Sequence, residues 1–88
     1  MPRYFFDIFE RGKRVVDEEG TKCEDIEAAK YEAKLSARDL ASAAIKTGVL
    51  DTETCVEIRG PERNLLASLT IAEVLRHPNT PEFGTGCE

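Results

Sequence analysis

The densest group of chemically active side chains in this 88-residue sequence is a set of six carboxylates near its beginning. They are Asp17, Glu18, Glu19, Glu24, Asp25 and Glu27. Carboxylate oxygens are the ligands that Ca²⁺ and Mg²⁺ prefer, but the ligand spacing of an EF-hand loop is absent. A solvated turn followed by a helix N-terminus, where the helix dipole favours negative charge, explains the same residues. The sequence favours this second interpretation, and we expect no metal site.

Groups suited to nucleophilic catalysis are sparse. The single histidine, His77, stands beside Pro78, so a serine or cysteine nucleophile lacks a well-placed imidazole base. With one histidine and no C-x-x-C pair, the three cysteines cannot complete the usual zinc spacing. Neither a Walker loop nor a G-x-G-x-x-G motif occurs. We therefore expect a protein that is not an enzyme, with no catalytic residue and no cofactor.

The cysteine pattern indicates a reducing compartment. Cys23, Cys55 and Cys87 form an odd set at distant positions, and cysteines of this kind are most often small buried residues. We expect Cys23 and Cys55 to be buried, and Cys87 to lie in a tail where it can oxidise. The first residues lack the basic segment and apolar stretch of a secretory signal, and no apolar run approaches the roughly 20 residues of a membrane span. A cytoplasmic location follows as the expectation.

A small basic cluster suggests a different chemistry. Arg11, Lys13 and Arg14 surround a predicted hairpin, close to Phe5 and Phe9. Basic and aromatic side chains together on a sheet are typical of platforms for single-stranded nucleic acid. The overall balance opposes this function, because 17 acidic residues outnumber 12 basic ones and the net charge is −5. Nucleic-acid binding is therefore the alternative and not the leading prediction.

Hydrophobic periodicity predicts the elements that position these side chains. Residues 3–10 alternate as a strand, and Gly12 can take the positive φ of a tight hairpin. Asp25 is a good N-cap for a long helix, and Gly48 stands where a helix C-cap favours glycine. The predicted strands are 3–10, 13–16, 54–59 and 65–69, and the predicted helices are 25–47 and 70–76. This order, β-β-α-β-β-α, indicates an α+β fold.

We expect an antiparallel sheet of two β-hairpins with the long helix packed on one face, in a single domain of residues 1–76. Residues 77–88 carry little apolar surface and are predicted to form a flexible C-terminal tail. The periodicities of strand and helix place one set of apolar residues between helix and sheet. That predicted core comprises Phe6, Ile8, Ala33, Leu40, Val56, Ile58 and Leu69.

Apolar residues outside this core predict a partner. Phe5 and Phe9 fall on the sheet face away from the helix, and Tyr31 and Leu35 fall on the outer side of the helix. A helix of about 22 residues spans roughly 33 Å, which is longer than a strand of about 20 Å, so part of it should overhang the sheet. A symmetric homodimer is the commonest way to cover such surfaces. The sheet face with Phe5 and Phe9 is the interface that we expect.

Three stretches of the sequence carry a distinctive pattern: Met1–Phe6, Asp17–Thr21, and Asp25–Ala29 with the alanine-rich helix that follows. Together they resemble one group of small alpha-proteobacterial proteins that is catalogued as a domain of unknown function. The resemblance covers roughly residues 2–75 and implies no activity, cofactor or catalytic residue. Asp7 departs from the pattern, because a histidine is common at this position. More distantly, the hairpin followed by a helix is similar to the fold of HicB-type antitoxins, which implies a partner-binding role.

Two functions follow from these observations. The leading prediction is a non-enzymatic protein-interaction module, regulatory or antitoxin-like and homodimeric. The alternative is a nucleic-acid or small-ligand binder that uses the open sheet face, with Arg11, Lys13 and Arg14 as its patch. Salt-dependent retention on nucleic acid separates the two, because phosphate binding weakens steeply as salt rises.

Overall fold

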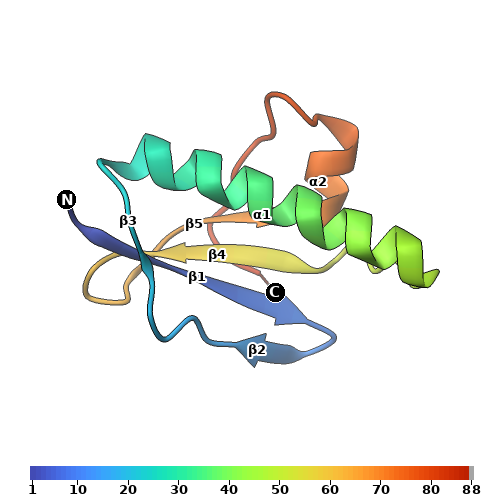
Figure 1. Ribbon diagram of the computed structural model, residues 1–88, viewed down its shortest axis with the longest axis horizontal. Coiled ribbons are helices and arrows are strands. Elements are labelled where there is room, and N and C mark those ends of the chain that lie inside the picture. The colour runs from blue at the N-terminus through green and yellow to red at the C-terminus, as the bar shows by residue number, and fades with distance from the viewer. Residues whose placement is uncertain (88) are drawn as a thin grey trace.

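Strand β1 (Arg3–Glu10) forms the centre of the sheet, because it pairs along both of its edges (Figure 1). On one side it pairs with β4 (Cys55–Arg59), which in turn pairs with β5 (Leu65–Thr70). On the other side two short strands, β2 (Lys13–Val15) and β3 (Thr21–Lys22), pair with opposite ends of β1. The structure is a computed structural model that describes residues 1–87, and the strand pairings within them are antiparallel.

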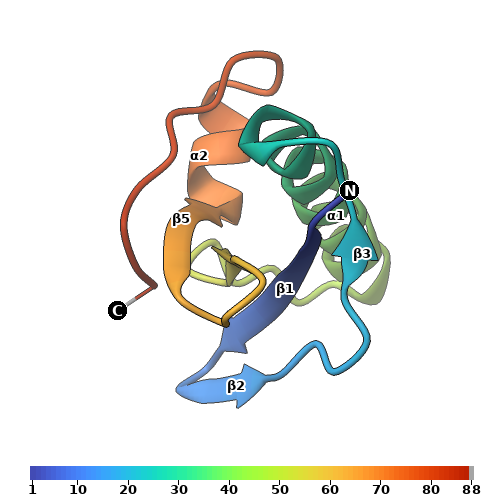
Figure 2. The ribbon, with the colours of Figure 1, turned by 90° about the vertical axis from the view of Figure 1, so that its left-hand side faces the viewer.

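Two helices complete the architecture, the long α1 (Ile26–Thr47) and the short α2 (Ile71–Arg76). α1 packs against β4 and β5, and α2 packs against α1 and β5, so one side of the sheet carries both helices (Figure 2). The predicted α+β class, with the order β-β-α-β-β-α and the long helix across one sheet face, is confirmed, and the two-residue β3 before α1 is an additional strand. Neither helix within residues 1–87 combines the length and hydrophobicity that a membrane span requires.

Local chemistry sets both ends of α1. The Asp25 carboxylate accepts a hydrogen bond from the Ala28 N–H at 2.9 Å, which is an N-cap contact. Gly48 ends the helix with a φ of 83°, and its N–H donates to the Ile45 carbonyl at 3.1 Å. The helix face towards the sheet is a buried row of small residues, Ala29, Ala33, Ala37 and Ala41. Because these side chains are short, α1 approaches the sheet closely.

The hydrophobic core lies between this alanine row and the sheet. Its largest fully buried apolar side chains are Ile58, Leu69 and Val56, which the sequence predicts to be buried. Phe6, Ile8 and Leu40 were expected there too, but they are only partly buried and pack against its margin. These side chains are only partly buried because α1 packs mainly against β4 and β5, so β1 lies near the edge of the area that the helix covers.

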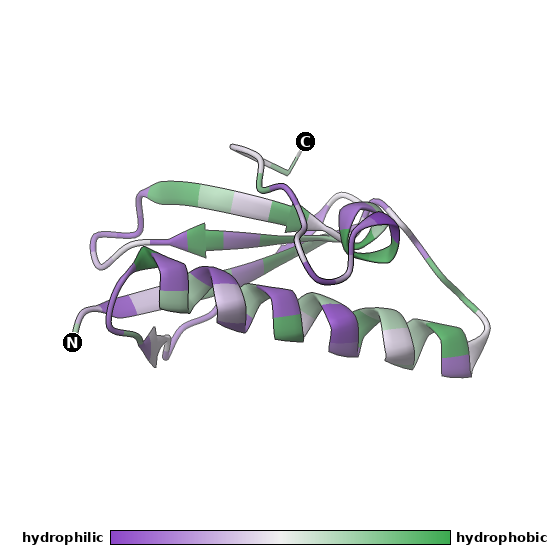
Figure 3. Ribbon diagram, turned by 90° about the horizontal axis from the view of Figure 1, so that it is seen from above, coloured by the Kyte–Doolittle hydropathy of each residue, from purple (hydrophilic) through white to green (hydrophobic). Residues whose placement is uncertain are grey.

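The end of α1 projects beyond the sheet, as Figures 1 and 3 both show. With 22 residues the helix is about 33 Å long, against a longest molecular extent of 37 Å. The overhang inferred from the lengths of helix and strand is therefore present. We call residues 41–50, the last part of α1 and the loop after it, the overhanging end.

The segment after α2 returns to the sheet along the outer side of β5 (Figure 2). Gly84 and Ser68 exchange two backbone hydrogen bonds of 2.9 Å, and Cys87 is joined to Cys55 by a disulfide with a Cα–Cα distance of 5.7 Å. These attachments differ from the flexible tail that the sequence predicts for residues 77–88. Glu88 lies outside the described residues. The sequence misses these attachments because backbone hydrogen bonds and one covalent bond have no hydrophobic signature.

Candidate functional site

The sheet face away from α1 gathers most of the candidate residues, and we call it the open face. Alternation along β1 sends Phe5, Asp7 and Phe9 to this face, because the intervening side chains point into the core. The register with β4 places one residue beside each of them: Arg59, Glu57 and Cys55, respectively. The predicted orientation of the two phenylalanines, opposite the helix, is therefore correct.

Four charged side chains form a connected network in the middle of the open face. Asp7 and Glu57 lie opposite each other in the register, and each is only 3% exposed. The Arg59 guanidinium contacts both, with Nε 3.5 Å from Asp7 Oδ2 and Nη2 donating to Glu57 Oε1 at 2.9 Å. Arg14 of β2 also donates to Glu57 Oε1. Two guanidinium groups therefore compensate two buried carboxylates.

The network favours ionised groups over proton transfer. Burial by itself would raise the pKa of Glu57, but hydrogen bonds from Arg14 and Arg59 outweigh it and hold that pKa below its ordinary value. Glu57 therefore stays ionised near neutral pH, where a general acid would have to carry a proton. Within residues 1–87, no buried side-chain nitrogen or oxygen lacks a hydrogen-bond partner. This arrangement suits a structural ion network that ties β2 and β4 together across β1.

Asp17 completes the sheet edge between β2 and β3. Its Oδ2 accepts from the Phe6 N–H and its Oδ1 from the Gly20 N–H, both at 3.0 Å. Its own N–H donates to Asp7 Oδ1 at 3.0 Å. Between β2 and β3 no strand pairs with this part of β1, and the Asp17 carboxylate accepts the backbone hydrogen bond that a neighbouring strand would accept. Through its own N–H, Asp17 also connects the loop between β2 and β3 to the ion network. The sequence predicts Asp17 in a solvated turn and gives no signal for this role.

The remaining acidic residues do not assemble into a cation site. Asp25 caps α1, and Glu27 lies 3.9 Å from Lys30 Nζ one helical turn away. Across the part of the chain that the structure describes, no group of three metal-ligating side chains comes together. The acidic cluster therefore serves a turn, an edge and a helix N-terminus.

The two phenylalanines of the open face are less accessible than the sequence suggests. Phe5 is buried, because the Arg63 guanidinium lies 4.0 Å from its ring centroid and Gly20 packs against its edge. Phe9 is partly buried, with the Arg14 guanidinium 5.4 Å from its ring centroid. Arginine side chains thus cover the aromatic pair that was expected to anchor a partner.

The basic residues of the hairpin do not form one patch. Arg14 pairs with Phe9 in the register and faces the open side, where Glu57 neutralises it. Lys13 pairs with Glu10, one position along, and so faces the opposite side of the sheet. Arg11 lies in the turn, with a φ of 53°. The three basic side chains of the hairpin are therefore not gathered on one face of the sheet.

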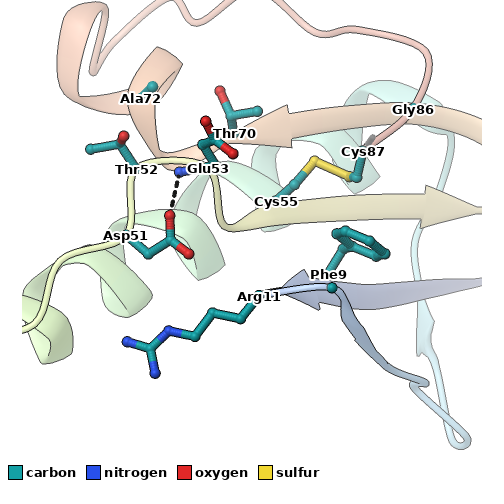
Figure 4. Close-up of a pocket in the computed structure, with 11 residues that line it drawn as sticks. Phe9, Arg11, Asp51, Thr52, Glu53, Cys55, Thr70, Ala72, Gly86 and Cys87 are labelled. Atoms are coloured by element: carbon teal, nitrogen blue, oxygen red, sulfur yellow. Dashed lines mark hydrogen bonds between the residues drawn. A yellow bond between two sulfur atoms is a disulfide. The ribbon is translucent and has the colours of Figure 1, made fainter.

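A pocket of about 330 Å³ opens at one end of the open face (Figure 4). Phe9 and the disulfide between Cys55 and Cys87 form one part of its wall, and Arg11 and Asp51 lie across from them. The sequence gives no signal for this pocket, because its lining comes from the hairpin, the loop before β4, the start of α2 and the C-terminal segment. The two cysteines in it are joined, so neither offers a free thiol.

Cys23 is the free cysteine among the described residues, and it is buried as expected. Burial raises the pKa of its thiol, and the nearby carboxylates of Glu32 and Asp25 raise it further. Because the thiolate is the reactive form, Cys23 is a poor nucleophile.

The overhanging end of α1 carries a second set of candidates. Ile45 is 63% exposed and Val49 is 54% exposed. A hollow of about 450 Å³ lies towards α2, with an apolar lining that includes Ala41, Val74, Leu75 and Pro78. Another of about 390 Å³ lies towards the hairpin, lined by residues that include Leu40, Ala43, Ala44 and Val49. The overhanging end is thus an apolar ridge between two hollows.

Tyr31 and Leu35, the helix residues expected at an interface, lie earlier on α1 and are exposed. Lys34 Nζ lies 5.1 Å from the Tyr31 ring centroid, so a cation partly covers this aromatic ring. The structure therefore does not unite the four predicted interface residues on one surface.

Comparison with known families gives one match. A family model described as a domain of unknown function, DUF6894, matches residues 3–72, which include both predicted hairpins and α1. No curated protein and no solved structure matches the chain.

Proposed function

The chain belongs to the DUF6894 family of domains of unknown function, and we propose that it is a non-enzymatic protein-interaction module that acts as a homodimer. The non-enzymatic part of this proposal is supported by the charged residues of the open face, which are paired with one another. Asp7, Glu57 and Arg59 bind one another, which leaves no general acid or base in the network. The apolar ridge at the overhanging end supports the interaction part, and it is the observation that carries the proposal.

The ridge and its hollows are complementary to a second copy of the chain. Ile45 and Val49 project from one protomer, and the hollow beside Leu75 is able to receive such side chains from another. A two-fold axis makes this contact reciprocal, because each protomer has both the ridge and the hollow beside Leu75. A stable dimer buries about 800 Å² on each partner, so the ridge would be the centre of a larger contact.

Charge favours the same pairing. Arg38 and Lys46 line the hollow beside α2, whereas Asp51 and Glu53 follow the ridge. None of these four residues takes part in the ion pairs found in residues 1–87. A protomer therefore presents an acidic loop beside its ridge and a cationic rim at its hollow, which attract each other between copies.

The test compares three variants, one for each surface considered. Ile45→Gln alters the ridge, Leu35→Gln alters the outer side of α1 with the same substitution, and Phe9→Ser alters the open face. We expect light scattering to give wild type, Leu35→Gln and Phe9→Ser a mass near twice 9.8 kDa, and Ile45→Gln a mass near 9.8 kDa. Circular dichroism must show that each variant is folded. A wild-type mass near 9.8 kDa at micromolar concentration would end the proposal, and a monomeric Phe9→Ser would move the interface to the open face.

The small-ligand alternative has its support in the pocket of Figure 4. Arg11 and Asp51 offer opposite charges there, beside the ring of Phe9. A ligand that carries both charges and an apolar part would match this lining. Shifts of the amide resonances of residues 51–55 in a screen of zwitterionic metabolites would support it, and no shift at all would leave the interaction module as the function.

A regulatory, antitoxin-like role in the cytoplasm is the physiological form that we propose for the module. It rests on the order of the elements and on the absence of a catalytic arrangement in the described residues. Co-expression with the product of the neighbouring gene tests this role. Isolation of a stable complex with a ribonuclease would support it, and isolation of the homodimer alone would remove the antitoxin part.

A further inference from the structure

Residues 84–87 are attached to the sheet at two points, and we call this segment the strap. At the first point the Ser68 N–H donates to the Gly84 carbonyl and the Gly84 N–H donates to the Ser68 carbonyl, both at 2.9 Å. The Ser68 hydroxyl also donates to the Gly86 carbonyl at 3.1 Å and accepts from the Gly86 N–H at 2.9 Å. At the second point Cys87 is bonded to Cys55 of β4. The strap therefore crosses from the edge of β5 onto the open face.

The strap covers the ion network. Ser68 lies beside Glu57 in the register between β4 and β5, and each of these side chains is only 3% exposed. The hollow above Glu57 is lined by Arg14 and Arg59 from the sheet and by residues of the strap. Removing the strap would expose both the outer edge of β5 and the Glu57 carboxylate.

The non-covalent hold on the strap is small. All four of its hydrogen bonds end at Ser68, and the two strap residues that make them, Gly84 and Gly86, are both glycines. Glycine loses more conformational freedom on ordering than any other residue. Thr85, between the two glycines, is exposed. Phe83, directly before the strap, packs against the margin of the core, and the disulfide fixes the strap at its other end.

We propose that Cys55 and Cys87 form a redox-operated clasp, closed over the β5 edge as a disulfide and open as two thiols. A dithiol reductant opens it: one thiolate attacks a clasp sulfur, and its second thiol then displaces the remaining cysteine. Two electrons and two protons pass to the protein, which gains two thiols, and the reductant becomes a disulfide. Both cysteines line the pocket of Figure 4, where Cys55 is 1% exposed and Cys87 5% exposed, so a small thiol reaches the sulfurs from the pocket side when the strap opens locally.

The clasp also explains how a chain expected in the cytoplasm could contain a disulfide. Disulfides in cytoplasmic proteins are rare, and those that occur are usually transient and redox-sensing. A chain in a reducing compartment would hold the open form, with the Ser68 N–H and carbonyl unpaired at the β5 edge. Oxidation would close that edge. This inference holds for the monomer and the dimer alike.

The experiment measures amide hydrogen exchange of the full chain before and after treatment with dithiothreitol. We expect reduction to speed exchange about tenfold or more in the peptides covering 66–70 and 81–87, with α1 unchanged. Cys87→Ser should show the fast exchange without reductant. Cys23→Ser, which removes the thiol outside the clasp, should respond to dithiothreitol as wild type does.

Three results would overturn the clasp. One is equal exchange at residues 66–70 in the oxidised and reduced proteins, which would mean that the strap stays in place without the bond. Another is a disulfide that dithiothreitol reduces only in denaturant. The third is loss of α1 protection on reduction, which would make the bond a requirement of the fold. Reduction reaches the open state in the wild-type chain, so a folding failure of Cys87→Ser does not affect the test.

Discussion

Replacing Arg59 by leucine tests the interpretation of the open-face network most directly. The substitution leaves Asp7 and Glu57, both 3% exposed, opposite each other with only Arg14 to compensate them. Breaking a buried ion pair by removing one partner typically costs about 3–5 kcal/mol, because a charge stays buried without its partner. An 88-residue domain has a total stability of roughly 4–13 kcal/mol, so Arg59→Leu should remove a large part of it.

Urea unfolding followed by circular dichroism measures this loss. Lys13→Leu is the matched control, because it removes an exposed cation on β2 that takes no part in the ion pairs of residues 1–87. This control should change the free energy of unfolding by less than about 0.5 kcal/mol. A loss below about 1 kcal/mol for Arg59→Leu would refute the reasoning, since the network would then be solvated.

The same variant has a defined pH dependence. The pKa of Glu57 is lowered in the folded protein, so its contribution to stability is present above the unfolded-state pKa and is lost as pH falls through the folded-state pKa. Without Arg59, protonation of Glu57 relieves its repulsion with the carboxylate of Asp7. The difference in unfolding free energy between wild type and Arg59→Leu should therefore narrow as pH falls from 7 towards about 4. A difference that widens on acidification would contradict the assignment.

Three further predictions concern the fold. Gly20→Ala should destabilise the protein by at least about 1 kcal/mol more than Gly12→Ala in thermal unfolding. Both glycines have a positive φ, but only at Gly20 would the added Cβ meet backbone and ring atoms within 2.9 Å. Equal losses of stability would show that these contacts relax. Ile58→Ala should cost about 2–5 kcal/mol, and Phe6→Ala less than the 3–5 kcal/mol of a fully buried phenylalanine, because Phe6 lies at the core margin. Cys23 should react with a maleimide at neutral pH far more slowly than in urea, because burial raises its pKa, and equal rates would show that it is accessible.

Much of the fold is predictable from the sequence because its elements have strong local signals. Asp25 and Gly48 mark the two ends of α1, and both act as caps in the structure. Alternation assigns Phe5 and Phe9 to the face opposite the helix, which the register confirms. The burial of Phe6 was overestimated, because periodicity gives the side of the sheet but not how far a helix covers it.

The candidate site was predictable only in part. Arg14 and Phe9 were recognised as a basic and aromatic pair, but Glu57, which neutralises Arg14, is 43 residues away in the chain. Asp17 was recognised as acidic, but its hydrogen bonds to β1 depend on the gap between β2 and β3. A partner of this kind has no fixed spacing that a sequence pattern can reveal.

The amino-acid sequence predicts both helices, the strands other than β3 and the residues that share a face, because geometry within an element repeats with a fixed period. The contact of Arg59 with both Asp7 and Glu57, and the bond from Cys87 to Cys55 over a separation of 32 residues, follow from the folded arrangement alone. These contacts depend on how β1 and β4 align and on how the C-terminal segment closes onto β5. The alignment of β1 with β4 and the attachment of the C-terminal segment to β5 result from the packing of the whole chain. They are therefore set by the sum of its long-range contacts and not by any local stretch of sequence.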